Sequence, residues 1–271
     1  MKIGIVIPAR NEETFLGKTL QCLLSQTLKP SIIVVVDDGS TDKTVEIARK
    51  CEAFVVHLPN RGYSAAGMPE LADVLNEGFR TLDKVAEFDY VMVLGADHPL
   101  PLTYTEEMVA RMEKDRRIVM ASGRRLGGPF SSEIPNPSGR IYRFKFMREI
   151  GFFPVNYGWE TYPILKALMM GYKVKSFDDI VTLQQRPLRV SVEKMYFWGK
   201  GMKALGYDSL YTLGRCVSWF FKSPKASINM LRGYLSSGVR EYSDLSNFTG
   251  RWQRRIILKR IEELPRFWKW S

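Results

Sequence analysis

The sequence predicts an α/β fold in which helices cover a parallel, doubly wound sheet. Between residues 3 and 121, short apolar runs rich in β-branched residues alternate with longer segments of helical apolar spacing. Several of the apolar runs end abruptly in Pro, Gly or Asp. Strands that alternate with helices are typical of a parallel sheet, because each crossover needs a helix. Ligands bind beyond the carboxyl ends of such strands, so functional residues are expected there.

The first half of the chain contains five expected strands and four expected helices. The strands are Ile3–Ile7, Ile32–Val36, Ala53–His57, Tyr90–Leu94 and Ile118–Ala121, and the helices are Glu12–Gln26, Lys43–Lys50, Leu71–Leu82 and Thr105–Lys114. The segment Glu12–Gln26, for example, has apolar residues at helical spacing. Ser40 to Asp42 supply helix N-caps for Lys43–Lys50.

The second half is expected to be mostly helical. Ser122–Gly139 is rich in Gly, Pro and Ser, which predicts a long loop of the kind that often has a function. The expected helices are Arg140–Ile150, Thr161–Met170, Val192–Ala204, Leu210–Phe221, Ala226–Tyr234 and Gln253–Leu264, and two short strands are expected at Val174–Phe177 and Ile180–Leu183. We therefore expect a domain at 1–198 and a helical extension at 199–271.

Composition limits the class of protein. Three cysteines without CxxC spacing argue for a reducing compartment without disulfides or a zinc site. The start, MKIGIVIPARNEE, is not a signal peptide, and no charge-free run approaches the ~18 residues of a membrane span, so we expect a cytoplasmic protein.

The positive charge is concentrated near the end of the chain. Of the net +11, residues 199–271 contribute 14 Lys and Arg against 5 Asp and Glu, together with 12 of the 33 aromatic residues. This composition suits an anionic membrane surface or nucleic acid, and it also suits a solvated basic face on a helical subdomain. No nucleic-acid motif accompanies the charge, so we expect no nucleic-acid partner and peripheral association with the cytoplasmic face of the membrane.

Polar residues at strand ends are the first candidates for function. Asp37 and Asp38 could accept hydrogen bonds from a ribose or base, or form only a turn and N-cap. Asp97 and His98 offer a hard oxygen ligand and an imidazole, which suit Mn²⁺ or Mg²⁺ with a substrate phosphate completing the shell. Loop arginines that could clamp a diphosphate are Arg124, Arg125, Arg186 and Arg189.

One further acid has two interpretations. Glu160 follows an aromatic residue at an expected helix start, where it could favour the helix dipole or act as a general base. The sequence contains no GxGxxG after the first strand and no GxxxxGK[ST], so dinucleotide and P-loop functions are disfavoured.

The order of these motifs resembles that of family 2 glycosyltransferases with the GT-A fold. The motifs, spanning roughly residues 1–205, are IVIPARNEE, VVVDDGSTDKT, NRGYSAA, VMVLGADHPLP, ASGRRLGG, YGWETYPILKALMMGYKV and LQQRPLR. The resemblance implies a Rossmann-like, mostly parallel sheet and an inverting transferase that uses a nucleotide-activated sugar, UDP- or GDP-linked, with a divalent metal.

The resemblance also implies roles for individual residues. Nucleotide binding falls to Pro8, Arg10, Glu12, Asp37 or Asp38, and Arg61. Asp97 matches the last acid of the metal-binding DXD motif, and Glu160 matches the usual base. Two positions depart from the family pattern: Gly95 replaces the first DXD acid, and Thr161 follows Glu160 where many relatives have Asp.

Four functions therefore compete. The first is transfer of a sugar to a hydroxyl of a lipid-linked or surface-glycan acceptor. The second is a polyprenyl-phosphate sugar synthase, which ASGRRLGG also resembles and which needs no base because its phosphate acceptor is already ionised. The third is an inactive nucleotide-binding protein, suggested by Gly95. The fourth is a nucleic-acid binder that uses residues 199–271.

Overall fold

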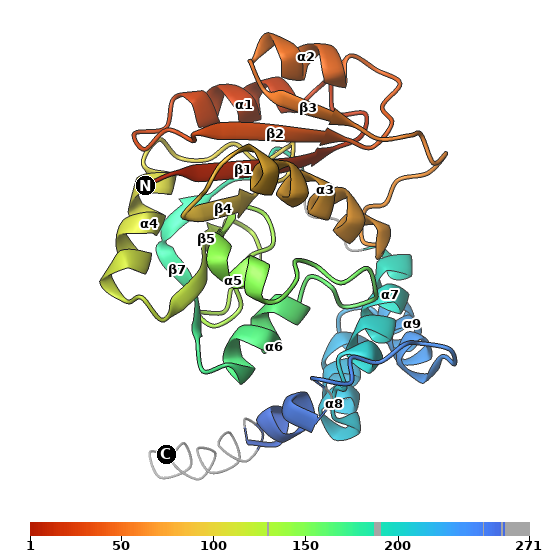
Figure 1. Cartoon of the computed structure of the whole chain (residues 1–271). Coiled ribbons are helices and arrows are strands. Elements are labelled where there is room, and N and C mark those ends of the chain that lie inside the picture. Colours follow the sequence, from red (N-terminus) through yellow and green to blue (C-terminus); the bar gives the residue numbers. More distant parts are fainter. Residues whose placement is uncertain (129, 187–190, 246, 256, 258–271) are drawn as a thin grey trace. The chain divides into compact units, whose positions relative to one another are not determined.

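A computed structural model describes residues 1–128, 130–186, 191–245, 247–255 and 257 (Figure 1). The chain divides into two compact units. The first unit comprises Met1–Ala66, Glu70–Val155 and Lys166–Leu188, and the second comprises Gly67–Pro69, Asn156–Leu165 and Arg189–Ser271. That residues 1–198 and 199–271 fold as separate domains stays a prediction.

The first unit is built on a seven-stranded, mostly parallel sheet. Its strands are β1 (Ile3–Ala9), β2 (Ile32–Asp37), β3 (Phe54–His57), β4 (Tyr90–Val93), β5 (Ile118–Arg125), β6 (Arg140–Arg143) and β7 (Lys173–Thr182), in the order β3-β2-β1-β4-β6-β5-β7. Only β6 runs antiparallel to its neighbours β4 and β5. Because β1 to β4 are parallel, their carboxyl ends share one edge, and the register places Asp37 beside Ala9 and His57.

Helices cover both faces of this sheet (Figure 1). They are α1 (Leu16–Leu24), α2 (Thr44–Lys50), α3 (Glu70–Val85), α4 (Tyr104–Lys114) and α5 (Phe144–Glu149). A further helix, α6 (Tyr162–Met169), begins in the second unit and ends in the first. Side chains alternate between the faces of a strand, so Ile5 and Ile7 of β1 join the core formed with α1 and α4. Gly4 and Val6 face the opposite way, against Leu82 and Gly78 of α3. The predicted α/β class with a mostly parallel sheet is confirmed.

The expected helix Arg140–Ile150 is wrong in its first four residues. Arg140–Arg143 is β6, and only Phe144–Glu149 is helical. The buried Arg140 guanidinium donates to the backbone oxygens of Pro135 and Asn136, which holds the preceding loop, while Tyr142 pairs with Val91. Pairing in the sheet therefore overrides the helical spacing of this segment.

Two further expectations for strands differ from the structure. The two short strands at 174–183 form one strand, β7, in which the exposed Asp178 and Asp179 sit at a register shift against β5. Asp179 accepts a hydrogen bond from Arg111 at 2.7 Å. β5 extends to Arg125, so the loop predicted from Ser122 begins after that residue.

The second unit contains three helices that follow one another in sequence. They are α7 (Val192–Ala204), α8 (Ser209–Phe220) and α9 (Pro224–Leu235). Residues 247–255 are also helical, so the helix expected at Gln253–Leu264 starts earlier than predicted. Most of the later part of that expected helix lies outside the described residues. Among the described residues, no helix is both long and apolar enough to cross a membrane.

Glycines bring α7 and α9 into close backbone contact. A Cβ placed on Gly199 would lie 2.0 Å from the carbonyl oxygen of Met230, and one on Gly233 would lie 2.0 Å from that of Tyr196. Neither obstacle is a flexible side chain, so any larger residue would force the two backbones apart.

We expect Gly199→Ala to lower the free energy of unfolding of the second unit by about 3 kcal/mol, at the upper end of overpacking costs. The exposed helical Gly214 of α8 is the matched control, because its Cβ would meet nothing within 4 Å and Gly214→Ala should stabilise by about 0.5–1 kcal/mol. Tryptophan fluorescence during denaturation reports on this unit, since the first unit contains no tryptophan. Equal stability of the two variants would contradict the close helix contact.

Candidate active site

Two adjacent carboxylates, Asp37 and Asp38, lie at the carboxyl end of β2. Asp37 is fully buried, and its Oδ1 accepts a hydrogen bond from Ser40 N at 3.1 Å while its Oδ2 lies 2.6 Å from His57 Nδ1. Asp38 is also buried; its Oδ1 accepts from Arg61 Nε at 2.9 Å and forms an ion pair with Arg61 Nη2 at 2.7 Å. Asp37 therefore holds the strand end together, and Asp38 is the carboxylate in contact with the predicted nucleotide-binding arginine.

Arg10 joins this pair from the loop after β1. Its Nη1 donates to the backbone oxygen of Asp38, and its Nη2 donates to Asn60 Oδ1 at 2.7 Å. Pro8, half-buried near the end of β1, pairs with Val36 of β2. The ends of β1 and β2 and the loop after β3 thus gather most of the predicted nucleotide-binding residues.

Asp97 lies after β4 at the same edge of the sheet and is nearly buried. Its Oδ1 and Oδ2 accept from Gln184 Nε2 at 2.9 and 3.1 Å, and Arg186 Nε lies 3.8 Å from Oδ2. Arg186 Nη2 also pairs with Glu12 Oε2. Burial raises the pKa of Glu12 above its ordinary value, and the Arg186 guanidinium opposes that rise. One arginine therefore stands between two carboxylates that are 85 positions apart in the sequence.

Gln184 connects Asp97 to a second predicted diphosphate arginine. Its Oε1 accepts a hydrogen bond from Arg125 Nη1 at 3.0 Å, while its Nε2 donates to Asp97. The amide thus orients a carboxylate and a guanidinium at once. Two positive side chains, Arg125 and Arg186, consequently lie at the Asp97 site.

The other two predicted arginines are placed differently. The Arg124 side chain is exposed, and its backbone oxygen accepts from Thr182 Oγ1 at 3.3 Å within the β5–β7 pair. Arg189 lies outside the described residues. A diphosphate role for either stays a prediction.

Gly95 and His98 are joined through a serine of the long loop. Ser138 Oγ accepts from Gly95 N at 2.8 Å and lies 2.7 Å from His98 Nδ1, and a Cβ on Gly95 would lie 3.2 Å from both Ser138 Oγ and Asp97 Oδ1. Burial lowers the pKa of His98 to about 4, so the ring is neutral at neutral pH. His98 Nε2 is buried without a hydrogen-bond partner. The contacts of His98 support the turn that carries Asp97.

These side chains fit a divalent cation only in part. In the described part of the chain, no three His, Cys, Asp or Glu side chains gather as a metal site. Asp97 is a hard carboxylate at a site with two arginines, and Gly95 contributes no ligand. Mg²⁺ is commonly held by one or two carboxylates together with substrate phosphates. The donor set therefore fits a cation that binds together with a diphosphate.

The predicted base, Glu160, belongs to the second unit and lies in the turn before α6. The neighbouring Trp159 is buried, and its Nε1 donates to the Met68 backbone oxygen at 3.1 Å. Thr161 N donates to Gly158 O at 2.9 Å, which closes the turn. The buried indole fixes this turn and leaves Glu160 exposed to solvent. Its role as a base stays a prediction.

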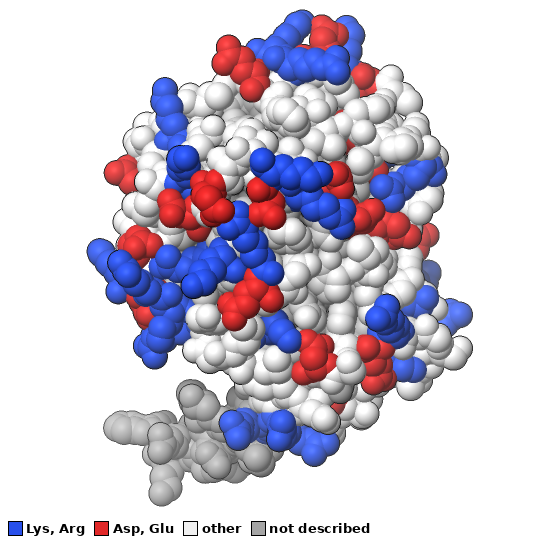
Figure 2. Space-filling model, viewed as in Figure 1, with Lys and Arg blue, Asp and Glu red and all other residues white. Residues whose placement is uncertain are grey.

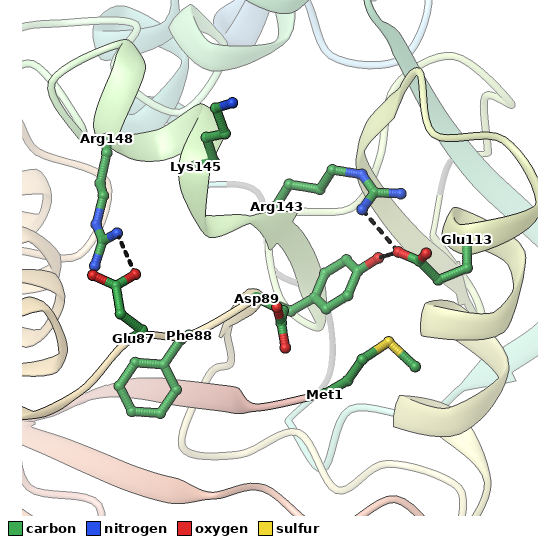
Figure 3. Close-up of a pocket in the computed structure, with 9 residues that line it drawn as sticks. Met1, Glu87, Phe88, Asp89, Glu113, Arg143, Lys145 and Arg148 are labelled. Carbon is green, nitrogen blue, oxygen red and sulfur yellow. Dashed lines mark hydrogen bonds and ion pairs between the residues drawn. The ribbon is translucent and has the colours of Figure 1, made fainter.

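A separate hollow lies where β4 begins, away from the carboxyl ends. It has a volume of about 420 Å³ and is lined by Met1, Glu87, Phe88, Asp89, Tyr90, Glu113, Arg143, Lys145 and Arg148. Figure 3 shows two of its arginines paired with acids of the same wall, Arg143 with Glu113 at 2.8 Å and Arg148 with Glu87 at 2.9 Å. Over the first unit, the face drawn in Figure 2 likewise carries basic side chains among acidic ones. Because both of its arginines are paired with acids of the same wall, this hollow is a poor candidate for the donor diphosphate.

Sequence reasoning missed Gln184, Ser138 and Asn60. Gln184 is 87 positions from Asp97, and Ser138 is 43 positions from Gly95, so no local pattern connects them. The only available signal for Gln184 was its place in the segment that contains Arg186.

The family comparison agrees with this geometry. The model of glycosyl transferase family 2 matches residues 4–180, which include the seven-stranded sheet except Ile3 of β1 and the last two residues of β7.

Curated relatives match shorter segments. An uncharacterized protein of Methanocaldococcus jannaschii is 51% identical over 67 residues, which cover 24% of this chain and 26% of that protein. The chondroitin synthase of Pasteurella multocida is 30% identical over 128 residues, covering 45% and 12%. A 4,4'-diaponeurosporenoate glycosyltransferase of Staphylococcus haemolyticus is 36% identical over 100 residues, covering 36% and 26%. The chain thus spans about a quarter or less of the length of the curated relatives it matches.

Solved structures share the fold at low identity. The mannosyltransferase PcManGT from Pyrobaculum calidifontis, in complex with GDP-Man and Mn²⁺, has a TM-score of 0.62 and 16% identity, covering all of this chain and 88% of that one. TarS of S. aureus, in complex with UDP, has a TM-score of 0.57 and 17% identity, covering 82% and 72%. These likenesses confirm the GT-A fold.

Proposed function

Since this chain belongs to glycosyl transferase family 2, we propose that it transfers a sugar from a nucleotide-diphosphate sugar to an acceptor hydroxyl. The acceptor is lipid-linked or a surface glycan, and the configuration at the anomeric carbon of the sugar is inverted. The donor nucleotide is UDP or GDP. Relatives solved with UDP or with GDP-Man and Mn²⁺ support a donor of this class.

The observation that carries the proposal is the paired charge at the carboxyl ends of β1, β2 and β4. Asp38 is held by Arg10 and Arg61, and Asp97 is flanked by Arg186 and, through Gln184, by Arg125. A nucleoside diphosphate carries a neutral hydrogen-bonding sugar and base at one end and negative oxygens at the other. Asp38 suits the ribose or base, and the arginines beside Asp97 suit the diphosphate.

The proposed reaction needs a base and a stabilised leaving group. The acceptor oxygen attacks the anomeric carbon, and the bond from that carbon to the donor phosphate oxygen breaks, so the nucleoside diphosphate leaves with the electron pair. Glu160 takes the proton of the acceptor hydroxyl. Arg125 and Arg186 stabilise the negative charge that develops on the leaving diphosphate.

Asp97 would hold the divalent cation, and His98 would act by supporting its turn or as a further ligand. When bound, the cation supplies positive charge at the diphosphate oxygens. A carboxylate oxygen has more than one lone pair, so Asp97 would hold the cation while it still accepts from Gln184 Nε2. Because a diphosphate would supply further oxygen ligands, cation binding should strengthen when a nucleoside diphosphate is present.

A panel of UDP- and GDP-sugars, incubated with the full chain in Mn²⁺, Mg²⁺ or EDTA, tests the proposal through the release of nucleoside diphosphate. We expect release from one nucleotide class, dependent on the cation. Arg61→Ala should raise the donor KM about tenfold by removing a charged hydrogen bond, whereas Arg80→Ala, which removes an exposed arginine paired with Glu77, is the matched control. Binding of UDP or GDP without release from any sugar would instead support the inactive nucleotide-binding protein.

We also propose that the chain acts at the cytoplasmic face of the membrane as a peripheral protein. The excess of basic and aromatic residues at 199–271 supports this location. A membrane location would bring the enzyme to a lipid-linked acceptor.

A further inference from the structure

Helix α8 of the second unit leaves most of its large apolar side chains outside the core. It buries Thr212 and Cys216, and Trp219 packs partly buried against the same core cluster as Cys216. The five large apolar side chains on its outer face and at its end are 49–85% exposed; they are Leu210, Leu213, Val217, Phe220 and Phe221. A helix of a soluble protein normally turns its apolar stripe toward the core.

These five residues, which we call the α8 apolar face, form one continuous stripe. Leu210, Leu213, Val217 and Phe220 are spaced by three or four positions, so they lie above one another on one side of the helix. The other exposed positions of α8 are Ser209, Gly214 and Ser218, and its one charged side chain, Arg215, is half-buried, so the apolar stripe itself contains no charged residue. Contiguous exposed apolar surface of this kind marks a site of interaction with a partner or a membrane.

The charge around this face identifies the kind of partner. From Ser209 to Arg240 the sequence contains five basic residues and no acidic one; they are Arg215, Lys222, Lys225, Arg232 and Arg240. Lys222 and Lys225 are exposed directly after the apolar face, and the Lys222 Nζ lies 5.6 Å from the centre of the Trp219 ring. Leucine and phenylalanine flanked by lysine, arginine and tryptophan are the composition of helices that lie in an anionic membrane interface.

We infer that the α8 apolar face inserts into the interfacial region of an anionic lipid bilayer, with Lys222 and Lys225 at the level of the headgroups. This inference rests on the proposed peripheral membrane location and assigns it to one helix. The occupant is lipid and not a nucleic acid, because the exposed stripe of α8 is apolar and suits acyl chains rather than phosphates.

Sedimentation of the full chain with phosphatidylcholine vesicles, with and without phosphatidylglycerol, tests the inference at low salt. We expect the wild-type chain to bind the anionic vesicles. The double variant Leu213→Glu with Phe220→Glu should lose about tenfold or more in partitioning, because each change removes a large apolar side chain that would be buried in the lipid. The double variant Leu126→Glu with Phe130→Glu is the matched control. It makes the same two changes at side chains that are 53% and 42% exposed, close to the 52% and 49% of the test pair.

The possible failures are distinguishable. If the wild-type chain does not bind anionic vesicles, the peripheral location itself is wrong. If it binds and both double variants bind equally well or equally poorly, the assignment to α8 is wrong. If the wild-type chain is a dimer without lipid and the α8 double variant is a monomer, a second copy of the chain covers this face and the lipid assignment is wrong.

Discussion

Replacing Glu160 with Gln should lower kcat for transfer to a hydroxyl acceptor by about 10²- to 10⁴-fold, the usual contribution of a general base. Glutamine keeps the size of the side chain but cannot take the acceptor proton. The turn should persist, because it is held by the buried Trp159 and its hydrogen bond to Met68. Donor affinity should also persist, because Arg10, Asp38 and Arg61 are unchanged. Steady-state kinetics and donor titration of the same preparation measure both.

The matched control is Glu193→Gln, which removes an exposed acid of the same unit, in the first turn of α7. It should leave kcat unchanged. Full turnover by Glu160→Gln, with a polyprenyl phosphate as acceptor, would instead identify a polyprenyl-phosphate sugar synthase. A phosphate oxygen is already ionised and needs no base, so this one variant separates the two classes of acceptor.

The fold could be predicted where one physical signal dominates. β1, β2 and β4 are buried apolar runs, and α3 and α4 have strong helical spacing, so their positions follow from the sequence to within a few residues. The predicted ends of α7 and the predicted end of α9 are similarly close to the observed ones. The start of α7 is marked in the sequence by Ser191, whose side chain caps the helix by accepting from Lys194 N.

The fold was harder to predict where contacts distant in the sequence decide the structure. β6 depends on pairing with β4 and β5, and its four residues are too few for the strand preference of Ile141 and Tyr142 to identify a strand. Helix α1 begins at Leu16 and not at Glu12, because the loop before it bonds to the loop after β2. Asn11, at a φ of 54°, donates its backbone N–H to Ser40 and accepts from Thr41 N, so the chain cannot yet be helical there.

The residues of the candidate site could likewise be predicted only in part. Carboxylates directly after strands, such as Asp38 and Asp97, are visible in the sequence because the sheet brings strand ends to one edge. The partners that orient them come from loops whose path the sequence does not specify. Gln184 is the clearest case, since an amide in a polar segment carries no sign that it will bridge Asp97 and Arg125.

Asp97→Ala should lower kcat/KM by about 10²- to 10³-fold, because it removes the carboxylate proposed to hold the cation at the leaving diphosphate. His98→Ala should cost about tenfold or less, because His98 acts on Asp97 through Ser138 and the turn at Gly95. Removing a buried ring also lowers stability, so activity must be compared at equal folded fraction, measured by thermal unfolding. Binding of Mn²⁺ in the presence of UDP or GDP gives a second readout that does not depend on turnover.

Gln184→Ala distinguishes two possible roles of the Asp97 carboxylate: binding the cation, or only positioning the arginines. If Asp97 binds a cation with the donor, removing the Gln184 amide leaves that carboxylate in place, so Mn²⁺ affinity should be largely retained while kcat falls moderately. If Asp97 serves only to hold Gln184, and through it Arg125, then Gln184→Ala should be as damaging as Asp97→Ala, and neither should alter Mn²⁺ binding. Equal losses in Asp97→Ala and His98→Ala at equal folded fraction would contradict a direct role for the carboxylate. Because Gly95 supplies no second acid and Glu12 is paired with Arg186, the cation proposal depends on Asp97.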